Sequence, residues 1–223
     1  MYANSRSVTS AQDGVHEQLA AVVEKHARSE YRKPFMPYNR AAFDASVEAW
    51  RAAGGLPLIL DAGCGVGLST RRLAQRHPDH FVIGIDQSAD RLSRNVAWEG
   101  PEPRNFVCVR ADLVDYWRLM HDAGIRPARH LLLYPNPWPK IGHLGRRWHG
   151  HPVFPTIVAL GGEIECRSNW RVYIEEFASA LTQLTGNEVR AKPFVPRPPI
   201  TPFEKKYMDS GHTLWHCRIS LQP

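Results

Sequence analysis

The sequence has few cysteines and no long apolar run, and each lack argues against a class of protein. Its four cysteines include no Cys-x-x-Cys pair, which disfavours a disulfide scaffold and a cysteine-based metal site. No apolar stretch approaches the roughly 18–20 residues of a membrane span, and the first ten residues lack the apolar centre of a secretory signal. We therefore expect a cytoplasmic protein whose thiols are buried as small apolar groups. These thiols are Cys64, Cys108, Cys166 and Cys217.

The chain also lacks internal repeats and any sign of a second domain. Its 223 residues are 43% hydrophobic and 22% charged, a composition typical of one soluble α/β domain with a substantial core. We expect residues 1–40 to form a partly mobile N-terminal extension and residues 41–223 to form the folded domain. The net charge of +6 permits a polyanionic partner. The sequence specifies no oligomeric state.

Short apolar strands alternate with amphipathic helices along the chain. The predicted strands cover residues 57–62, 81–86, 105–111, 129–135, 162–168, 188–195 and 213–221. The predicted helices cover residues 15–26, 41–53, 68–76, 89–98, 114–122 and 169–185. Repeated strand–helix units indicate a mostly parallel, seven-stranded sheet with helices on both faces. The last two strands have no predicted helix between them, only a proline-rich connector, which indicates an antiparallel hairpin at one edge of the sheet.

A glycine-rich turn follows the first predicted strand. Asp61 ends that strand, and Gly63, Gly65 and Gly67 follow at alternate positions before a predicted helix. Such glycines let the backbone approach a ligand at a helix N-terminus. The second strand ends in Asp86, at a distance typical of a carboxylate that binds ribose hydroxyls. The G-x-G-x-G spacing favours S-adenosylmethionine (SAM), and a dinucleotide site or a plain structural turn is the alternative.

Short polar side chains stand at five predicted strand ends. In parallel sheets, ligands bind at the carboxyl ends of the strands, so we expect these side chains to lie near a bound ligand. Each one alone also has an ordinary interpretation as a turn or helix-capping residue. The five residues are Asp61, Asp86, Asp112, Asn136 and Asn169.

The most distinctive segment runs from residue 134 to residue 151. Asn136 and Trp138 flank a proline, and an aromatic ring there can stack on a nucleobase. Lys140, Arg146 and Arg147 follow, a cluster that would favour a phosphate backbone. Three interleaved histidines suggest a metal site. No acid or cysteine completes a ligand set, however, so we expect no bound metal. A solvated basic loop is the ordinary alternative.

The chain resembles the bacterial tRNA (guanine-N7)-methyltransferases over about residues 56–221. Three separated pieces carry the resemblance, in the order that the family shows. They are Tyr134-Pro-Asn-Pro-Trp-Pro-Lys140 with Arg146-Arg147, Asn169-Trp170 with Tyr173, and Thr201-Pro-Phe-Glu204 with Gly211-His212. The resemblance implies a Rossmann-like class I methyltransferase fold, SAM as cofactor and tRNA as substrate.

Together, the residue patterns and the resemblance predict the site residues. Those expected to bind SAM are Asp61, Gly63, Gly65, Gly67, Asp86, Asp112 and Asn136, of which Asn136 is also expected to be catalytic. Those expected to bind the substrate are Trp138, Lys140, Arg146, Arg147, Asn169, Thr201, Phe203 and Glu204.

The chain departs from the family at the substrate positions. Asn136 and Asn169 stand where the family has aspartates, so two negative charges are missing. The family's arginine-glycine after phenylalanine-glutamate is replaced by Lys205-Lys206-Tyr207, and the helix before Gly161 is expected to be short. An Asn-Pro-aromatic loop resembles that of methyltransferases that act on amino groups. The alternatives to guanine N7 are therefore an exocyclic amine, a small heteroaromatic compound, and a non-catalytic protein that binds SAM or RNA.

Overall fold

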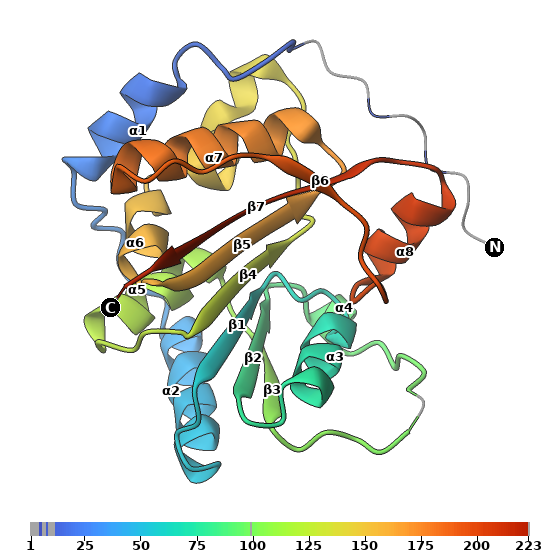
Figure 1. Ribbon diagram of the computed structural model, residues 1–223. Coiled ribbons are helices and arrows are strands. Elements are labelled where there is room, and N and C mark those ends of the chain that lie inside the picture. Colours follow the sequence, from blue (N-terminus) through green and yellow to red (C-terminus); the bar gives the residue numbers. More distant parts are fainter. Residues whose placement is uncertain (1–4, 6–7, 9–11, 99, 223) are drawn as a thin grey trace. The chain divides into compact units, whose positions relative to one another are not determined.

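The computed structural model describes residues 5, 8, 12–98 and 100–222 and contains α-helices, β-strands and two 3-10 helices (Figure 1). The strands are β1 (Leu58–Ala62), β2 (Phe81–Asp86), β3 (Phe106–Arg110), β4 (Arg129–Leu133), β5 (Gly162–Ser168), β6 (Lys192–Phe194) and β7 (Leu214–Leu221). The α-helices are α1 (Leu19–Ala27), α2 (Pro37–Ala52), α3 (Leu68–Arg76), α4 (Ala89–Leu92), α5 (Leu113–Asp122), α6 (Phe154–Ala159), α7 (Arg171–Thr185) and α8 (Pro202–Asp209). The 3-10 helices are η1 (Ile141–Arg146) and η2 (Trp148–Gly150). The start of the N-terminal extension predicted to be mobile lies largely outside the described residues.

The seven strands form one sheet in the order β3-β2-β1-β4-β5-β7-β6. Strand β1 pairs in parallel with β2 and β4, and β2 pairs in parallel with β3. Strand β6 at the edge pairs antiparallel with β7. The predicted fold class is therefore confirmed, with helices around a mostly parallel sheet and one antiparallel edge pair.

The chain forms two compact units, each assembled from distant parts of the sequence. Unit 1 comprises residues Met1–Lys33, Tyr134–Ala159 and Ile164–Ser220. Unit 2 comprises residues Pro34–Leu133, Leu160–Glu163 and Leu221–Pro223. Unit 2 therefore contains the glycine turn, and unit 1 contains the 134–151 segment.

Unit 2 is built on strands that are buried on both faces. Every residue of β1 and β2 is buried, as expected for apolar runs in a parallel sheet. Helix α3 packs closely on β2 because Gly84 has no side chain: a Cβ atom there would lie 2.3 Å from Thr70 Oγ1. On α2, the Ser46 hydroxyl lies 2.7 Å from the Tyr116 hydroxyl of α5, a buried contact that joins the two helices.

Unit 1 is organised around α7, the helix that the sequence predicted over residues 169–185. Its buried face includes Tyr173, Ile174, Phe177 and Leu181, at the three- and four-residue spacing of an amphipathic helix. Helices α1 and α6 pack against α7. Gly186 ends it in the left-handed conformation that favours glycine (φ +72°).

Several predicted helix boundaries were wrong. The helix predicted over 89–98 ends at Leu92, where the Ser93 hydroxyl bonds back to the Asp90 carbonyl and competes with helical hydrogen bonding. The helix predicted over 15–26 begins only at Leu19, because the His16 N–H donates to a side chain of α7 (Glu176 Oε1, 3.0 Å). Helix α2 begins at Pro37, four residues before its predicted start, with proline in the first turn.

The expectation of no helix between the last two strands was also wrong. Helix α8 lies between β6 and β7, which nevertheless pair antiparallel, with Lys192 opposite His216. Thr201 caps α8 by accepting the Glu204 N–H at 2.9 Å. The pattern Thr-x-x-Glu is a helix-start signal, but the surrounding prolines concealed it. The short helix expected before Gly161 is confirmed as α6, with six residues, whereas η1 and η2 were not predicted.

No helix among the described residues is long and apolar enough to cross a lipid bilayer.

Candidate active site

In unit 2, the glycine turn joins β1 to α3 with all three glycines in the left-handed region. Gly63, Gly65 and Gly67 have φ angles of +84°, +61° and +77°, which other residues rarely adopt. The N–H groups of Gly63 and Cys64 both donate to the Ile85 carbonyl, at 2.8 and 2.9 Å. These bonds fix the turn to the end of β2.

The turn leaves space beside Gly65. A Cβ atom at Gly65 would meet no other atom within 4 Å, whereas one at Gly67 would lie 3.0 Å from Cys108 Sγ. Gly67 is therefore required by packing inside unit 2. Gly65 faces space that a ligand can enter, which fits the predicted cofactor.

Asp86, at the end of β2, is tied to the same turn. Its Oδ2 atom accepts the Gly65 N–H at 2.9 Å, and its Oδ1 atom accepts the Ser88 N–H at 2.8 Å. The side chain is 4% exposed, and Arg91 lies 3.6 Å from Oδ2. Each carboxylate oxygen has a second lone pair, so Asp86 keeps acceptor capacity, and its contact with the ribose of SAM stays a prediction.

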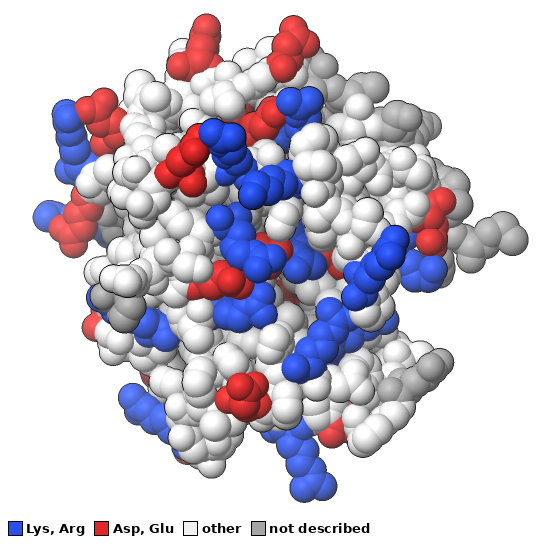
Figure 2. Space-filling view, in the orientation of Figure 1, with Lys and Arg blue, Asp and Glu red and all other residues white. Residues whose placement is uncertain are grey.

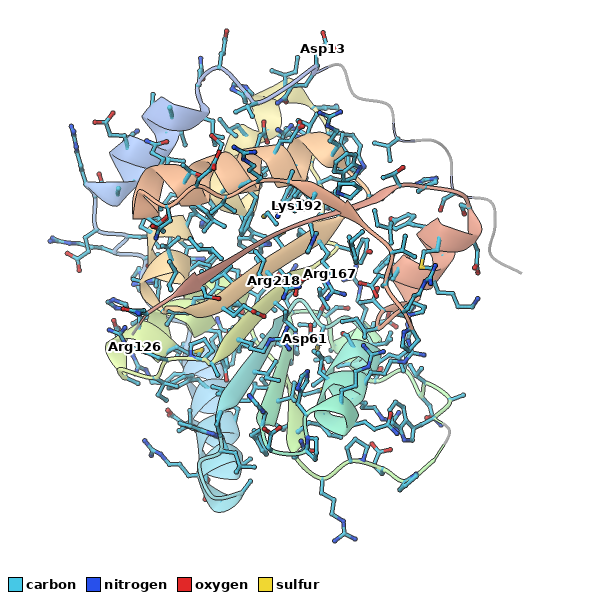
Figure 3. The ribbon with its side chains drawn as sticks, viewed as in Figure 1. Asp13, Asp61, Arg126, Arg167, Lys192 and Arg218 are labelled. Carbon is cyan, nitrogen blue, oxygen red and sulfur yellow. The ribbon has the colours of Figure 1, made fainter. Side chains whose placement is uncertain are left out.

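Asp61 of β1, labelled in Figure 3, is 1% exposed. Its Oδ2 atom accepts the hydroxyls of Ser69 and Thr70 at 2.6 and 2.7 Å, which anchors the first turn of α3. Burial raises the pKa of Asp61 to about 6, although the two hydroxyls act in the opposite direction. Asp61 therefore holds the turn in shape, and its contact with SAM stays a prediction.

Asp112 is the N-cap of α5, which agrees with its alternative interpretation as a helix-capping residue. Its side chain accepts the Val114 N–H at 2.8 Å, and its own N–H donates to Asn39 Oδ1 at 2.9 Å. Asn39 Nδ2 donates to Asp115 Oδ2 at 2.6 Å. Sequence reasoning missed Asn39 and Asp115, which fix the start of α2 to the start of α5.

In unit 1, Asn136 is exposed in a strained loop after β4. Its Oδ1 atom accepts the Trp138 N–H at 3.3 Å, the bond of an Asx-turn. Tyr134 and Trp138 have positive φ angles of 55° and 45°, and they are the described non-glycine residues with this feature. Such strain often accompanies ligand-binding sites.

The Trp138 ring is the centre of a small cationic cluster. The Arg146 guanidinium lies 4.8 Å from its centroid, and the His143 ring meets it edge-on at 5.6 Å. Burial, followed by the charges of Arg146 and Lys140, lowers the pKa of His143. Lys140 and Arg146 are exposed, as a phosphate contact requires.

Arg147 does not have the exposure that a phosphate contact needs. It is 3% exposed and donates from Nη1 to Glu176 Oε2 of α7 at 2.6 Å. Its Nε and Nη2 atoms donate to the Trp138 carbonyl at 3.3 and 3.2 Å, and Nη2 also donates to the Lys140 carbonyl at 3.4 Å. The structure thus corrects the predicted role: Arg147 holds the loop from inside.

Glu176 gathers further partners that the sequence did not reveal. The buried His149 Nε2 lies 2.8 Å from Glu176 Oε2, and the Gln12 side-chain amide donates to Glu176 Oε1. Burial alone would raise the pKa of Glu176, but His149, Gln12 and Arg147 together lower it to about 2. A glutamate among apolar helix positions was the sequence signal for this network.

The predicted substrate residues of α8 differ in their exposure. Thr201 and Glu204 are buried: Glu204 accepts the Ile200 N–H at 2.6 Å and pairs with Arg167 Nη1 at 2.8 Å. Substrate contacts by these two side chains are therefore not supported, because their polar atoms shape the start of the helix. Phe203 is 48% exposed.

Asn169 lies at the end of β5 beside a histidine. Its Nδ2 atom lies 3.1 Å from His212 Nδ1. His212 Nε2 lies 3.3 Å from the Ser5 carbonyl, so a neutral His212 donates there and accepts from Asn169. One N–H of the Asn169 amide is thereby used, and its oxygen keeps its capacity as an acceptor.

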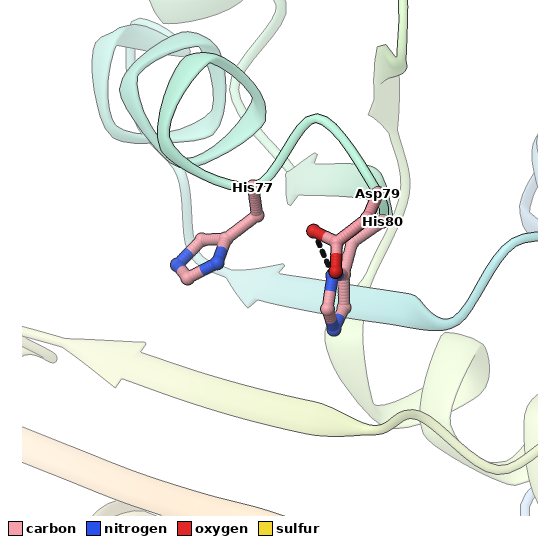
Figure 4. Close-up of side chains that lie close together, drawn as sticks. All are labelled: His77, Asp79 and His80. Carbon is pink, nitrogen blue, oxygen red and sulfur yellow. Dashed lines mark hydrogen bonds and ion pairs between the residues drawn. The ribbon is translucent and has the colours of Figure 1, made fainter.

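One group among the described residues has the composition and spacing of a metal site. His77, Asp79 and His80 follow α3, with ligand atoms within 4.8 Å of one another (Figure 4). Asp79 Oδ1 lies 2.8 Å from His80 Nδ1, and Arg129 Nη1 lies 3.1 Å from His77 Nε2. Burial and the charge of Arg129 lower the pKa of His77. A guanidinium so close opposes a metal cation, and no predicted site residue belongs to the group.

The chain is similar to known methyltransferases. A family model described as "Putative methyltransferase" matches residues 56–217. The tRNA (guanine-N(7)-)-methyltransferase of Ralstonia pickettii (strain 12J) is 29% identical over 187 residues, which cover 81% of this chain and 72% of the relative. The protein of the same name from Burkholderia thailandensis is 27% identical over 187 residues, which cover 81% and 69%.

Solved structures share the fold at low sequence identity. One is described as an antibiotic related methyltransferase and has a TM-score of 0.56 and 15% identity, covering 88% of this chain and 98% of that one. Another is a mutant form of the 16S rRNA (adenine(1408)-N(1))-methyltransferase from Catenulisporales acidiphilia, with cosubstrate SAM. It has a TM-score of 0.52 and 21% identity, covering 81% and 92%. These matches confirm the methyltransferase fold, and the family match implies SAM as cofactor.

Proposed function

The chain belongs to the methyltransferase family that its residues 56–217 match, and we propose that it transfers a methyl group from SAM to N7 of a guanine in tRNA. The observation that carries the proposal is the similarity to tRNA (guanine-N(7)-)-methyltransferases over 81% of the chain. The glycine turn supports the cofactor part, because Gly65 faces open space and Asp86 keeps acceptor capacity.

In this reaction, the protein has to position the two reactants and stabilise the charge that develops. SAM supplies an electrophilic methyl group, and guanine N7 carries a free lone pair, so no general base is required. Asp86 would hold the ribose of SAM, and Gly65 would let the cofactor approach the backbone. Methylation leaves a positive charge on the base, and the Asn136 oxygen would stabilise it as a preorganised dipole.

The exposed cations of unit 1 support an RNA substrate. Lys140 and Arg146 lie beside Trp138, and a phosphate backbone would interact favourably with both. Within unit 1, Figure 2 shows further Lys and Arg side chains over the region of β5, β6 and β7. Figure 3 labels Arg167, Lys192 and Arg218 on β5, β6 and β7. Part of this charge is neutralised, since Glu165 accepts from Arg167 Nε at 2.8 Å.

The second candidate is methylation of an exocyclic amine, which the two amides favour. An amide oxygen at Asn136 can accept a hydrogen bond from an amine without placing a full negative charge beside it. The acceptor oxygen of Asn169 is likewise neutral. The substrate would then be an RNA base or a small heteroaromatic compound.

The test is methyl transfer from labelled SAM to bulk tRNA, followed by digestion and identification of the methylated nucleoside. We expect N7-methylguanine. A methylated exocyclic amine would replace the first candidate with the second. The absence of any labelled nucleoside, with SAM and tRNA both bound, would identify a non-catalytic protein.

Variants at Asn136 separate the two reactions further. For guanine N7, Asn136→Asp puts a carboxylate near the developing cation, so single-turnover methyl transfer should hold or increase. For an exocyclic amine, the same change should slow the reaction. Asn136→Ala should slow either one by about 2–4 kcal/mol of barrier, and wild-type turnover in that variant would limit Asn136 to a role in the turn.

A further inference from the structure

Four rings of unit 1 form a continuous row on one side of α8. The aromatic row comprises Tyr134, Phe203, Tyr207 and His212. Tyr207 lies 5.4 Å from His212 with an interplanar angle of 14°, and Phe203 lies 6.1 Å from Tyr207 at 22°. Tyr134 lies beside both of these rings, 5.7 Å from Tyr207 at 42° and 6.4 Å from Phe203 at 30°. Phe203 and Tyr207 are four residues apart, and therefore share one face of the helix.

The row is not explained by packing alone. Phe203 remains 48% exposed, whereas core packing would bury a phenylalanine. Tyr134 has a φ angle of +55°, and its hydroxyl is buried without a hydrogen-bond partner among the described residues. A strained, unsatisfied tyrosine beneath an exposed ring is more typical of a ligand platform than of a stable core.

The surroundings of the row match a nucleotide. Lys206 Nζ lies 5.9 Å from the Tyr207 ring centroid, so positive charge borders the stacked rings. His212 holds the amide nitrogen of Asn169 at 3.1 Å and leaves the amide oxygen as an acceptor. Stacking on aromatic rings combined with nearby cations is the common way in which proteins bind unpaired bases.

We infer that the aromatic row is the stacking platform for an unpaired nucleobase of the RNA. The base stacks against the exposed ring of Phe203, and Tyr207 and His212 extend the platform. His212 is a positioning residue, because it keeps the Asn169 oxygen directed as an acceptor toward an N–H group on the edge of the base. This inference rests on the proposed function in assuming an RNA substrate.

The test measures stacking directly. A short single-stranded RNA containing 2-aminopurine is titrated with wild-type protein, Phe203→Leu, Tyr207→Leu and, as a matched control, Tyr38→Leu. Tyr38 is an aromatic residue of unit 2 that is 55% exposed. We expect wild type to quench the fluorescence, and both row variants to lose quenching and bind RNA about tenfold or more weakly. The control should match wild type.

A conservative variant and a second ligand sharpen the result. Phe203→Trp retains a ring and should restore quenching. Wild-type affinity and quenching in Phe203→Leu and Tyr207→Leu, with intact thermal unfolding, would overturn the inference. The second arm of the test is titration with guanosine monophosphate. If Phe203→Leu and Tyr207→Leu lose as much affinity for this nucleotide as for RNA, the platform binds free nucleotides and the RNA assignment is overturned.

The outcomes also separate the platform from the proposed reaction. If the row variants lose RNA binding but wild type methylates no tRNA, the platform stands and the proposed reaction fails. If Phe203→Leu binds RNA and methylates tRNA with the kcat/KM of wild type, the reaction stands and the platform fails. For His212→Ala, the expected result is a fall in the preference for guanine over inosine at the stacked position, since inosine lacks the exocyclic amine. An unchanged preference would remove the positioning role.

Discussion

The glycine turn of unit 2 is held by its own backbone N–H groups, which donate to groups at the end of β2, whereas the Asn136 loop of unit 1 is held by the buried side chain of Arg147, which is paired with Glu176. In unit 2, the N–H groups of Gly63 and Cys64 donate to the Ile85 carbonyl, and the Gly65 N–H donates to the carboxylate that ends β2. In unit 1, the carbonyls of Trp138 and Lys140 accept hydrogen bonds from the Arg147 guanidinium. The glycine turn therefore depends on several groups at the end of β2, and the Asn136 loop depends on a single arginine side chain.

The difference has consequences for evolution and for stability. The glycine turn has several supports, which are its glycines, the Ile85 carbonyl and the carboxylates of Asp61 and Asp86. A loop fixed by a buried charge loses its support when either partner is lost, because the remaining charge is left unpaired. The two positions where an amide replaces a family aspartate, Asn136 and Asn169, lie in unit 1, where exposed or half-buried side chains carry the predicted substrate contacts.

The largest expected effect comes from breaking the ion pair. Glu176→Ala leaves the Arg147 guanidinium buried without its carboxylate, and should reduce the free energy of unfolding by about 3–5 kcal/mol. Urea unfolding measures the change. Arg190→Ala removes the cation of an exposed pair with Glu188 and should cost less than about 1 kcal/mol. Equal losses in the two variants would mean that the buried pair is no more important than an exposed one.

Acid should act on the same pair. The pKa of Glu176 is lowered to about 2 in the folded protein, below the ordinary value of a glutamate in the unfolded chain. The unfolded state therefore binds the proton more readily, so this stabilisation is complete above about pH 4.5 and is lost as the pH falls toward 2. Unfolding measured across that range should show a steeper decline in wild type than in Glu176→Gln. Parallel curves would contradict the low pKa.

The sequence was informative where structure depends on neighbouring residues. Strand β2 and helix α3 were predicted at their observed ends, because an apolar run and a glycine turn are local patterns. The position of Asp86 at the end of β2 followed from the common rule for strand–turn–helix sites, but its bond to the Gly65 N–H was not predicted. These features lie in unit 2, where the chain between residues 58 and 86 is continuous.

The sequence was least informative about the Glu176 network. Gln12 and Glu176 are 164 residues apart, and no pattern connects them. Arg147 was assigned to phosphate because it stands with Lys140 and Arg146 in a cluster of cations. Only the tertiary structure shows that α7 presents a carboxylate beneath that loop.

Asp86 tests whether unit 2 binds the cofactor as proposed. Asp86→Ala removes a charged acceptor, and should weaken SAM binding by about 1.5–3 kcal/mol, measured by calorimetry. Because Asp86 also accepts the Gly65 N–H, circular dichroism must show that the fold persists. Asp79→Ala removes an exposed aspartate of the same unit and should leave SAM affinity unchanged. Unchanged affinity in a folded Asp86→Ala protein would exclude the ribose contact.

A pair of glycine variants separates strain from ligand contact. Gly54 and Gly65 both have positive φ angles, +91° and +61°, and a Cβ atom at either would meet no atom within 4 Å. Alanine should therefore reduce the free energy of unfolding by about 1 kcal/mol at each position. At Gly65 alone, the new methyl group occupies the space assigned to the cofactor, so SAM affinity should also fall. Equal SAM affinity in the two variants would show that the cofactor does not approach Gly65.

The smallest expected effect concerns single phosphate contacts in unit 1, where exposed and buried cations should behave differently. Lys140→Gln and Arg146→Gln should each reduce the magnitude of the log–log salt slope of tRNA binding by about 0.7–0.9. The reduction follows because one fewer counterion is released from the RNA. Fluorescence anisotropy at several salt concentrations gives the slope, with the exposed Arg190→Gln as control. Arg147 lies in the same segment but is 3% exposed, so Arg147→Gln should leave the slope unchanged while lowering stability. A slope that falls as much for Arg147→Gln as for Arg146→Gln would mean that the buried ion pair opens to receive RNA.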